Sequence, residues 1–180
     1  MTGANLIIDN DFMTDEQKSF VDDVVLGNNF SWFFLSGSVN KYDNNWFFFH
    51  TVLDRPEGYS VYENRVNSEH SDFFVDVFDT FCSKNEIEYD TIFRISANLV
   101  FPHEVKESLV HVDHDFPHRQ MIVYLNESPT SRTNIFDTDR KTLLHEIKAE
   151  KYKGVVFNSN PHSLTNPTEG RRVVIVYTFE

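Results

Sequence analysis

The chain has 180 residues and a formal net charge of −12, and 40% of its residues are hydrophobic, including 18 Phe and 7 Tyr. This composition is typical of a globular protein with a substantial core, and we expect one domain over residues 1–180. The acidic balance argues against nucleic acid as a partner, because binding to phosphates needs clustered Lys and Arg. No apolar run has the length of a membrane span, so we expect no membrane partner.

The N-terminal sequence lacks the basic and apolar regions of a signal peptide. Cys82 is the only cysteine, so a disulfide within the chain is impossible and a reducing environment is expected. Both features predict a soluble, cytoplasmic protein.

The first half of the chain is predicted to begin with a helix and continue into strands. Residues 14–17 (Thr-Asp-Glu-Gln) have the form of a capping box, and an apolar stripe within residues 20–25 follows before Gly27 ends the helix. Residues 30–35 and 46–52 are aromatic, β-prone runs that we predict to be strands. The Trp-Phe-Phe-Phe run at 46–49 could line a substrate groove, but packing in the sheet core is favoured.

A second helix is predicted over about residues 68–84. Its large apolar residues fall on one helical face, which suits a helix packed against a sheet. These residues are Phe73, Phe74, Val77, Phe78 and Phe81.

From Ile92 onward the pattern is one of short strands separated by turn residues. The strands are predicted over residues 92–101, 109–113, 119–125, 133–136, 142–147, 155–158 and 172–179. Helices followed by such a run predict a mainly β fold with flanking helices (α+β), a double-stranded β-helix or jelly roll. Its core is expected over about residues 92–179, with the helices and strands of residues 1–91 supporting one sheet.

Three residues have the types and spacing of a metal centre. His111 and Asp113 are two positions apart and would project from the same face of a strand, and His162 follows 49 residues after Asp113. Two His and one carboxylate form the facial triad of non-haem Fe(II) oxygenases, which leaves adjacent coordination positions open. The alternative is a surface strand pair plus a loop histidine. The order of the three residues, followed by Arg171 and Arg172, favours the metal centre.

The other histidines have no carboxylate partner at strand spacing. His114 is one step out of phase with His111 and is expected to face the opposite way. His103, His118 and His145 are expected to be exposed or to support the metal ligands, and His50 is expected in the core, with a substrate-facing position as the alternative. A structural zinc site is disfavoured because the chain has one thiolate. A cupin is disfavoured because it would have an H-x-H motif and a following Glu, and this sequence has neither.

The sequence around these residues resembles the prolyl 4-hydroxylase branch of the Fe(II)/2-oxoglutarate-dependent dioxygenases, which has compact phage-encoded members. Three segments carry the resemblance, which covers roughly residues 92–179. They are HVDHDFPHRQMIVYLN (111–126), FNSNPHS (157–163) and GRRVVIVYTF (170–179).

The resemblance implies a jelly roll that binds Fe(II) through His111, Asp113 and His162. It also implies 2-oxoglutarate as co-substrate, O₂ as oxidant and ascorbate as a candidate stimulant. The Gly-x-Arg spacing of the family selects Arg172 for the distal carboxylate of 2-oxoglutarate, with Arg171 as the alternative. Tyr124 is similar to the tyrosine that gives this carboxylate a hydroxyl contact, although a half-buried strand aromatic is an equal interpretation.

The substrate implied by the resemblance is a peptidyl residue such as proline. The alternatives are the same chemistry on a free amino acid or other small molecule, and a jelly roll that only binds. Two places differ from relatives that hydroxylate proline: Phe101-Pro102 stands where Tyr-Pro is frequent, and residues 128–133, expected to be a loop, lack Gly-Gly. The loop 114–118 is expected to contact a substrate chain.

Overall fold

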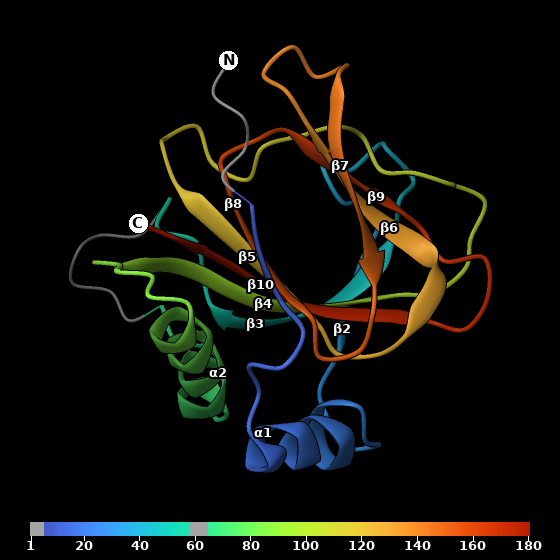
Figure 1. Cartoon of the computed structure of the whole chain (residues 1–180). Coiled ribbons are helices and arrows are strands. Elements are labelled where there is room, and N and C mark those ends of the chain that lie inside the picture. The colour runs from blue at the N-terminus through green and yellow to red at the C-terminus, as the bar shows by residue number, and fades with distance from the viewer. Residues whose placement is uncertain (1–5, 58–64) are drawn as a thin grey trace.

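The computed structural model describes residues 6–57 and 65–180, and two antiparallel sheets dominate it (Figure 1). The large sheet has the order β1-β8-β5-β10-β4-β3-β2 and the small one the order β7-β6-β9. The strands are β1 (Ile7–Asp9), β2 (Phe33–Leu35), β3 (Phe47–Leu53), β4 (Ile92–Val100), β5 (Arg119–Tyr124), β6 (Ser128–Phe136), β7 (Leu143–Ala149), β8 (Gly154–Asn158), β9 (His162–Thr165) and β10 (Arg172–Phe179). The predicted jelly roll with flanking helices is confirmed.

Two helical segments lie against the outer face of the large sheet (Figure 1). The first begins as α1 (Asp15–Phe20) and continues as the π-helical turn η1 (Val21–Val25). Thr14 caps it as predicted, with both reciprocal capping-box bonds present. The second, α2 (Ser71–Lys84), begins three residues later than predicted. No helix in the described part of the chain is long and apolar enough to cross a membrane.

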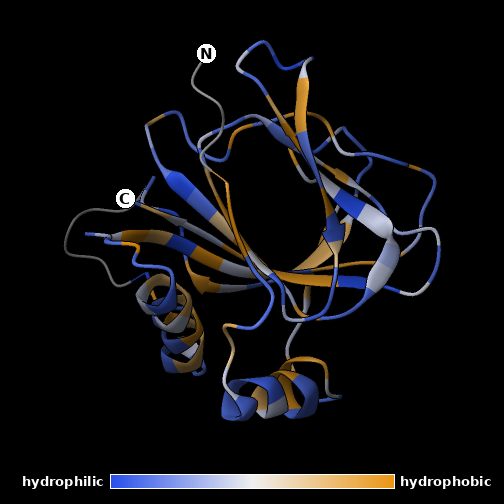
Figure 2. Cartoon of the chain, viewed as in Figure 1, coloured by the Kyte–Doolittle hydropathy of each residue, from blue (hydrophilic) through white to orange (hydrophobic). Residues whose placement is uncertain are grey.

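Strand alternation divides the large sheet into a face that packs on the helices and a face that lines the space between the sheets. In β10, Val173, Ile175 and Tyr177 belong to the core cluster shared with the helices. Arg172 and Val174 point the other way, into a cavity between the sheets. Figure 2 shows that the strands and helices each carry both hydrophilic and hydrophobic residues, as elements with two different faces do.

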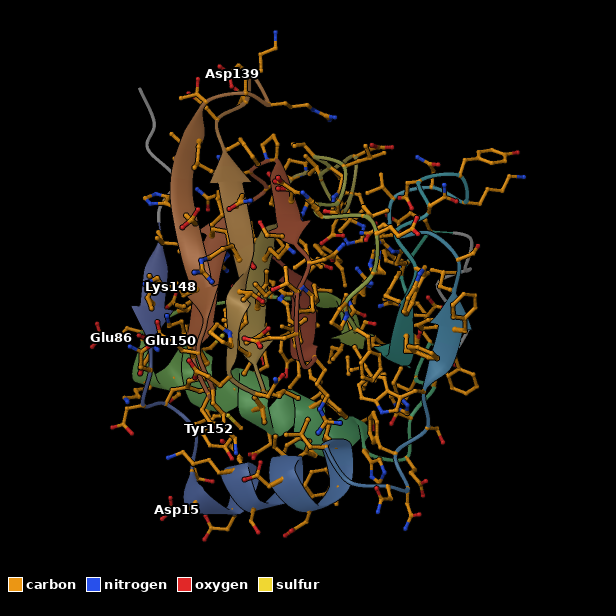
Figure 3. The ribbon with its side chains drawn as sticks, turned by 90° about the vertical axis from the view of Figure 1, so that its right-hand side faces the viewer. Asp15, Glu86, Asp139, Lys148, Glu150 and Tyr152 are labelled. Atoms are coloured by element: carbon orange, nitrogen blue, oxygen red, sulfur yellow. The ribbon has the colours of Figure 1, made fainter. Side chains whose placement is uncertain are left out.

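The small sheet is fastened to the N-terminal helical segment by the turn after β7. The Tyr152 hydroxyl donates to Asp22 Oδ2 at 2.8 Å, and Lys151 Nζ donates to the same oxygen at 2.9 Å. Figure 3 shows Tyr152 above this segment and Asp139 at the far tip of the β6–β7 hairpin. Both contacts involve partly exposed groups and hold the turn in place.

Several predicted strand limits were wrong. Residues 109–113 form no strand: the segment pairs with β9 through the isolated bridge His111↔His162 and turns away at Asp113. The expected loop at 128–133 belongs to β6. There the pairing with β7 shifts between Ser128 and Arg132, and this irregularity accommodates Pro129. The short strands β1 and β9 were not predicted, and β2 is shorter than the predicted run 30–35.

Gly154, in β8, packs directly against Phe81 of α2. A Cβ atom there would lie 2.5 Å from Phe81 Cε2 and 2.8 Å from Phe12 Cε1. Both rings are buried and pack edge to face, so neither can move aside cheaply. We expect Gly154→Ala to lower the free energy of unfolding by about 1–3 kcal/mol, as overpacked cores do, measured by chemical denaturation.

Phe81→Leu provides the control, because a smaller side chain makes room for the added methyl group. The double variant should lose less stability than the sum of the two single variants. Strict additivity would contradict this explanation of the glycine.

Candidate metal centre and its cavity

A cavity of about 310 Å³ lies between the two sheets. Its walls come from the inward-facing positions of β4, β5 and β10 on one side and from β6 and β9 on the other. The segment 108–113, which bridges to β9, completes one side. Val39 and Arg55, whose side chains are partly exposed, lie at the outer part of the wall.

The three residues of the predicted triad meet in this cavity. One potential ligand atom from each of His111, Asp113 and His162 lies within 4.8 Å of the others. The two imidazole rings have centroids 4.4 Å apart, and His111 Nε2 lies 4.0 Å from Asp113 Oδ1. His111 and His162 are held opposite each other by paired backbone bonds of 3.0 and 2.9 Å.

Hydrogen bonds orient both imidazoles toward the centre of the triad. His111 Nδ1 donates to the carbonyl oxygen of Leu109 at 3.0 Å, and His162 Nδ1 donates to that of Asn160 at 3.2 Å. Because a carbonyl only accepts, these bonds place the proton on Nδ1 and leave Nε2 of each ring as an acceptor, which in His162 lies 3.4 Å from Gln120 Nε2. Metal-binding histidines are commonly oriented in this way.

Asp113 is a buried carboxylate with one paired and one unpaired oxygen. Oδ1 lies 3.3 Å from Arg55 Nη2 and 3.3 Å from Arg94 Nη1. Burial alone would raise the pKa of Asp113, but Arg94 above all, then the two histidines and Arg55, lower it well below its usual range. Oδ2 is buried and has no hydrogen-bond partner within the described residues. An ionised carboxylate with a buried free oxygen beside two imidazole nitrogens fits a divalent metal.

The imidazole of His162 is neutral near pH 7. Burial, and next the neighbouring His111, lower the pKa of His162 from 6.5 to about 4. In the unfolded chain this imidazole takes up a proton near pH 6.5, whereas in the folded chain it does so only near pH 4. Between these values the unfolded state binds more protons, so stability falls as the pH drops.

We therefore expect the metal-free protein to lose about 3 kcal/mol of unfolding free energy between pH 7 and pH 4 through this residue. His162→Gln, which cannot titrate, should lose correspondingly less over the same interval. Urea unfolding of both proteins at the two pH values measures the difference. Parallel pH profiles would show that the His162 imidazole is not held neutral by burial.

At the inner end of the cavity lies Arg172, which is 5% exposed. Its Nη2 donates to Thr133 Oγ1 at 2.9 Å, and its buried Nε has no hydrogen-bond partner among the residues that the structure describes. Burial lowers the pKa of Arg172, and no carboxylate of the described residues pairs with it. A buried guanidinium without a counter-ion is costly, so this position favours an anionic ligand. Arg171, which precedes β10, is exposed.

Tyr124 is buried next to Arg172 but does not line the cavity. Its hydroxyl forms a 2.7 Å hydrogen bond with Thr133 Oγ1, and its ring centroid lies 5.3 Å from Arg172 Cζ. Burial raises the pKa of Tyr124, so the hydroxyl stays protonated. Tyr124 is therefore placed to orient Thr133 and Arg172.

The remaining histidines lie outside the cavity. His50 is a core residue, as favoured, bonded to Ser31 O and Ser68 Oγ at 2.8 Å each. His114 faces away from the triad and contacts Glu57 and Thr178. His118 is buried within the 114–118 loop, where its ring packs against that of His114. Of its two predicted positions, the exposed one is therefore wrong. His103 stacks on Trp46, and His145 lies half-buried in β7.

The segments considered for substrate contacts lie largely outside the cavity. No residue of the loop 114–118 lines the cavity, and Phe116 instead packs on Phe93. Phe101 is 37% exposed and contacts Phe48, so it does not line the cavity either. From the aromatic run 46–49, only Phe47 reaches the cavity wall.

Three polar residues near the triad were not predicted from the sequence. Arg94 and Arg55 contact Asp113, and Gln120 Nε2 lies 3.4 Å from His162 Nε2. Arg94 shares one face of β4 with Ser96 and Asn98, and a polar face on a central strand signals an inward-facing polar site. Arg55 follows β3 in an irregular segment, and no sequence signal marks it.

The architecture is similar to that of several solved structures. An oxidoreductase of the 2OG-Fe(II) oxygenase family from Burkholderia pseudomallei matches 97% of this chain and 84% of its own, with a TM-score of 0.76 and 12% identity. A prolyl-4-hydroxylase from Pseudomonas putida matches 98% of this chain and 93% of its own, with a TM-score of 0.63 and 12% identity.

A prolyl hydroxylase from Trichoplax adhaerens, solved in complex with a peptide fragment of the hypoxia inducible factor oxygen degradation domain, matches 97% of this chain and 83% of its own. Its TM-score is 0.62 and its identity 12%. No protein-family model and no curated protein matches the sequence. The chain therefore has the fold of the 2OG-Fe(II) oxygenases and prolyl hydroxylases.

Proposed function

We propose that this protein is an Fe(II)- and 2-oxoglutarate-dependent oxygenase that hydroxylates its substrate. One observation carries the proposal: the converging His111, Asp113 and His162 share a cavity with Arg172, a buried cation without a carboxylate partner among the described residues. A metal-binding face and an anion-binding end in one cavity suit a metal ion with a dicarboxylate co-substrate. The similar structures support the same reaction class.

The triad would hold Fe(II) through the unprotonated Nε2 atoms of His111 and His162 and through Asp113 Oδ2, with the metal replacing the Gln120 contact at His162 Nε2. Bound Fe(II) supplies O₂ activation coupled to the oxidative decarboxylation of 2-oxoglutarate to succinate and CO₂. The contribution of the protein is to keep His162 neutral and Asp113 ionised, so that both can bind the ion beside His111.

Arg172 would bind the distal carboxylate of 2-oxoglutarate. A guanidinium suits this role because its planar fork bonds both carboxylate oxygens and keeps its charge when buried. Thr133 Oγ1 lies between Arg172 and Tyr124 and accepts from Arg172, so it fixes the direction of the guanidinium. The apolar side chains of Ile122 and Val174 line the same cavity and limit water near this charge pair.

For the substrate, we propose a peptidyl residue, with proline as the first candidate. The Pseudomonas putida and Trichoplax adhaerens structures, both prolyl hydroxylases and the latter bound to a peptide, support this choice. A free amino acid or another small molecule is the second candidate. Arg55 and Arg94, which lie in the cavity wall beside the triad, favour it because they could bind the carboxylate of a small acid.

The test is incubation with Fe(II), 2-oxoglutarate and ascorbate, together with either proline-containing peptides or free amino acids. Succinate release and a mass gain of one oxygen atom in the substrate are measured, with Asp113→Ala as the inactive control. We expect substrate-dependent succinate release by the unaltered protein alone. Oxygen gain by a free amino acid but by no peptide would select the second candidate, and no succinate with either set would contradict the proposal.

A further inference from the structure

The wall of the cavity carries more positive charge than Asp113 and the two proposed ligands, Fe(II) and 2-oxoglutarate, together balance. Among the described residues, three guanidinium groups line it, those of Arg55, Arg94 and Arg172, and Asp113 is the one carboxylate in the lining. This excess belongs to a protein with a net charge of −12. A divalent metal would add to the positive charge, and the 2-oxoglutarate dianion would offset only the charge of that metal.

Arg55 and Arg94 converge on the same atom from different elements. Arg94, in β4, and Arg55, after β3, each place one guanidinium nitrogen 3.3 Å from Asp113 Oδ1. Arg55 also donates to the backbone oxygen of Asp113. Both are thus fixed beside the triad at Asp113 Oδ1, whereas Oδ2 has no partner among the described residues.

The charge of Asp113 balances one of these two cations. A single carboxylate oxygen shared by two guanidinium groups leaves like charges close together, which is unfavourable unless a further anion is present. Once Asp113 also binds a metal, its charge is divided among still more partners. Asp54 and Glu57 act on Arg94 over a longer distance, but neither lines the cavity.

Both arginines line the cavity and have N–H groups beyond those bonded to Asp113. A guanidinium has five N–H groups. Within the described residues Arg94 makes one hydrogen bond, through Nη1 to Asp113, although its side chain is only 16% exposed. The side chain of Arg55 is 39% exposed and reaches the outer part of the wall. A ligand entering the cavity would meet Arg55 first and Arg94 beside the triad.

We infer that Arg55 and Arg94 form a binding subsite for a carboxylate of the substrate that is oxidised, separate from the co-substrate position at Arg172. This inference rests on the proposed function and specifies its substrate class. Because the subsite adjoins Asp113, the carbon that is oxidised lies near a carboxylate in the substrate. The α-carboxylate of a free amino acid and an acidic side chain next to the target residue of a peptide would both satisfy it.

The experiment uses the full chain loaded with Mn(II), which does not support turnover, and with 2-oxoglutarate. Two matched pairs of probes are titrated by calorimetry: L-proline with L-prolinamide, and N-acetyl-Asp-Pro-amide with N-acetyl-Asn-Pro-amide. We expect the acid of at least one pair to bind about tenfold more tightly than its amide or more. Preference within the first pair indicates a free amino acid, and preference within the second indicates an acidic peptide.

Arg55→Gln should abolish the preference for the acid, and Arg55→Lys should retain part of it, because Lys keeps the charge without the fork. Arg132→Gln is the matched control: Arg132 pairs with Glu146 and does not line the cavity, so the preference should persist. If Arg55 only positioned Asp113, the Gln variant would weaken Mn(II) binding and affect acid and amide equally, which would overturn the inference.

Equal binding of acid and amide in both pairs, by protein that has bound Mn(II) and 2-oxoglutarate, would also overturn it. Failure of the unaltered protein to bind Mn(II) or 2-oxoglutarate is a different result. It would overturn the proposed function, and this inference with it.

Discussion

Replacement of His162 by Ala is expected to remove nearly all Fe(II) binding. His162 is buried, its Nε2 faces the other two ligands, and the pair His111–Asp113 left behind cannot hold a labile first-row ion well. His111→Ala and Asp113→Ala should have similar effects. The measurement is metal content after anaerobic loading and desalting, with circular dichroism to show that each variant is folded.

The matched control is His118→Ala, since His118 is equally buried and lies near the triad without belonging to it. That variant should keep its iron. Full iron occupancy in His162→Ala would show that the metal is bound by other residues.

Arg172→Ala is expected to weaken 2-oxoglutarate binding by about 2–5 kcal/mol, a loss of roughly 30-fold or more. Much of this cost arises because the carboxylate of the ligand would be buried without its counter-ion. The dissociation constant of 2-oxoglutarate is measured in the Mn(II)-loaded protein by calorimetry.

Arg171→Ala is the control for this variant, because Arg171 is the adjacent residue with the same charge and an exposed side chain. Its affinity for 2-oxoglutarate should remain close to that of the unaltered protein. A larger loss in Arg171→Ala than in Arg172→Ala would reverse the assignment of the two arginines.

The sequence pattern predicts the convergence of the triad, although part of the structural reasoning behind it was wrong. The prediction placed His111 and Asp113 on a strand, yet the structure has a single bridge at His111 and a bend at Asp113. Their side chains still converge because the backbone is extended at His111, where it pairs with β9, and turns only afterwards. The inward direction of Arg172 follows from β10, a strand predicted with its correct limits.

The charges around the triad depend on tertiary contacts that local patterns do not contain. Arg55 reaches Asp113 from 58 residues away in the chain, and its own segment has no periodicity that fixes its direction. The predicted limits of β6 were wrong for a related reason. Its first half is polar and contains Pro129, which indicates a turn, while pairing with both neighbours in the small sheet imposes a strand.

The position of Tyr124 shows how packing modifies a role implied by resemblance. Its predicted contact with the co-substrate carboxylate would require the hydroxyl to line the cavity. Instead the hydroxyl meets Thr133, whose side chain stands between Tyr124 and the cavity. A threonine at this point of β6 could not be recognised as part of the site from a sequence in which residues 128–133 suggested a loop.

The most direct test of the central claim, that one cavity binds both Fe(II) and 2-oxoglutarate, is an anaerobic titration of the protein with the two ligands, followed by visible absorption. Chelation of Fe(II) by the 2-oxo acid gives a weak metal-to-ligand charge-transfer band. We predict that this band appears only when both ligands are present, saturates at one Fe(II) per chain and is absent in His162→Ala. A protein that develops no band at saturating concentrations of both ligands, or an undiminished band in His162→Ala, would contradict the account.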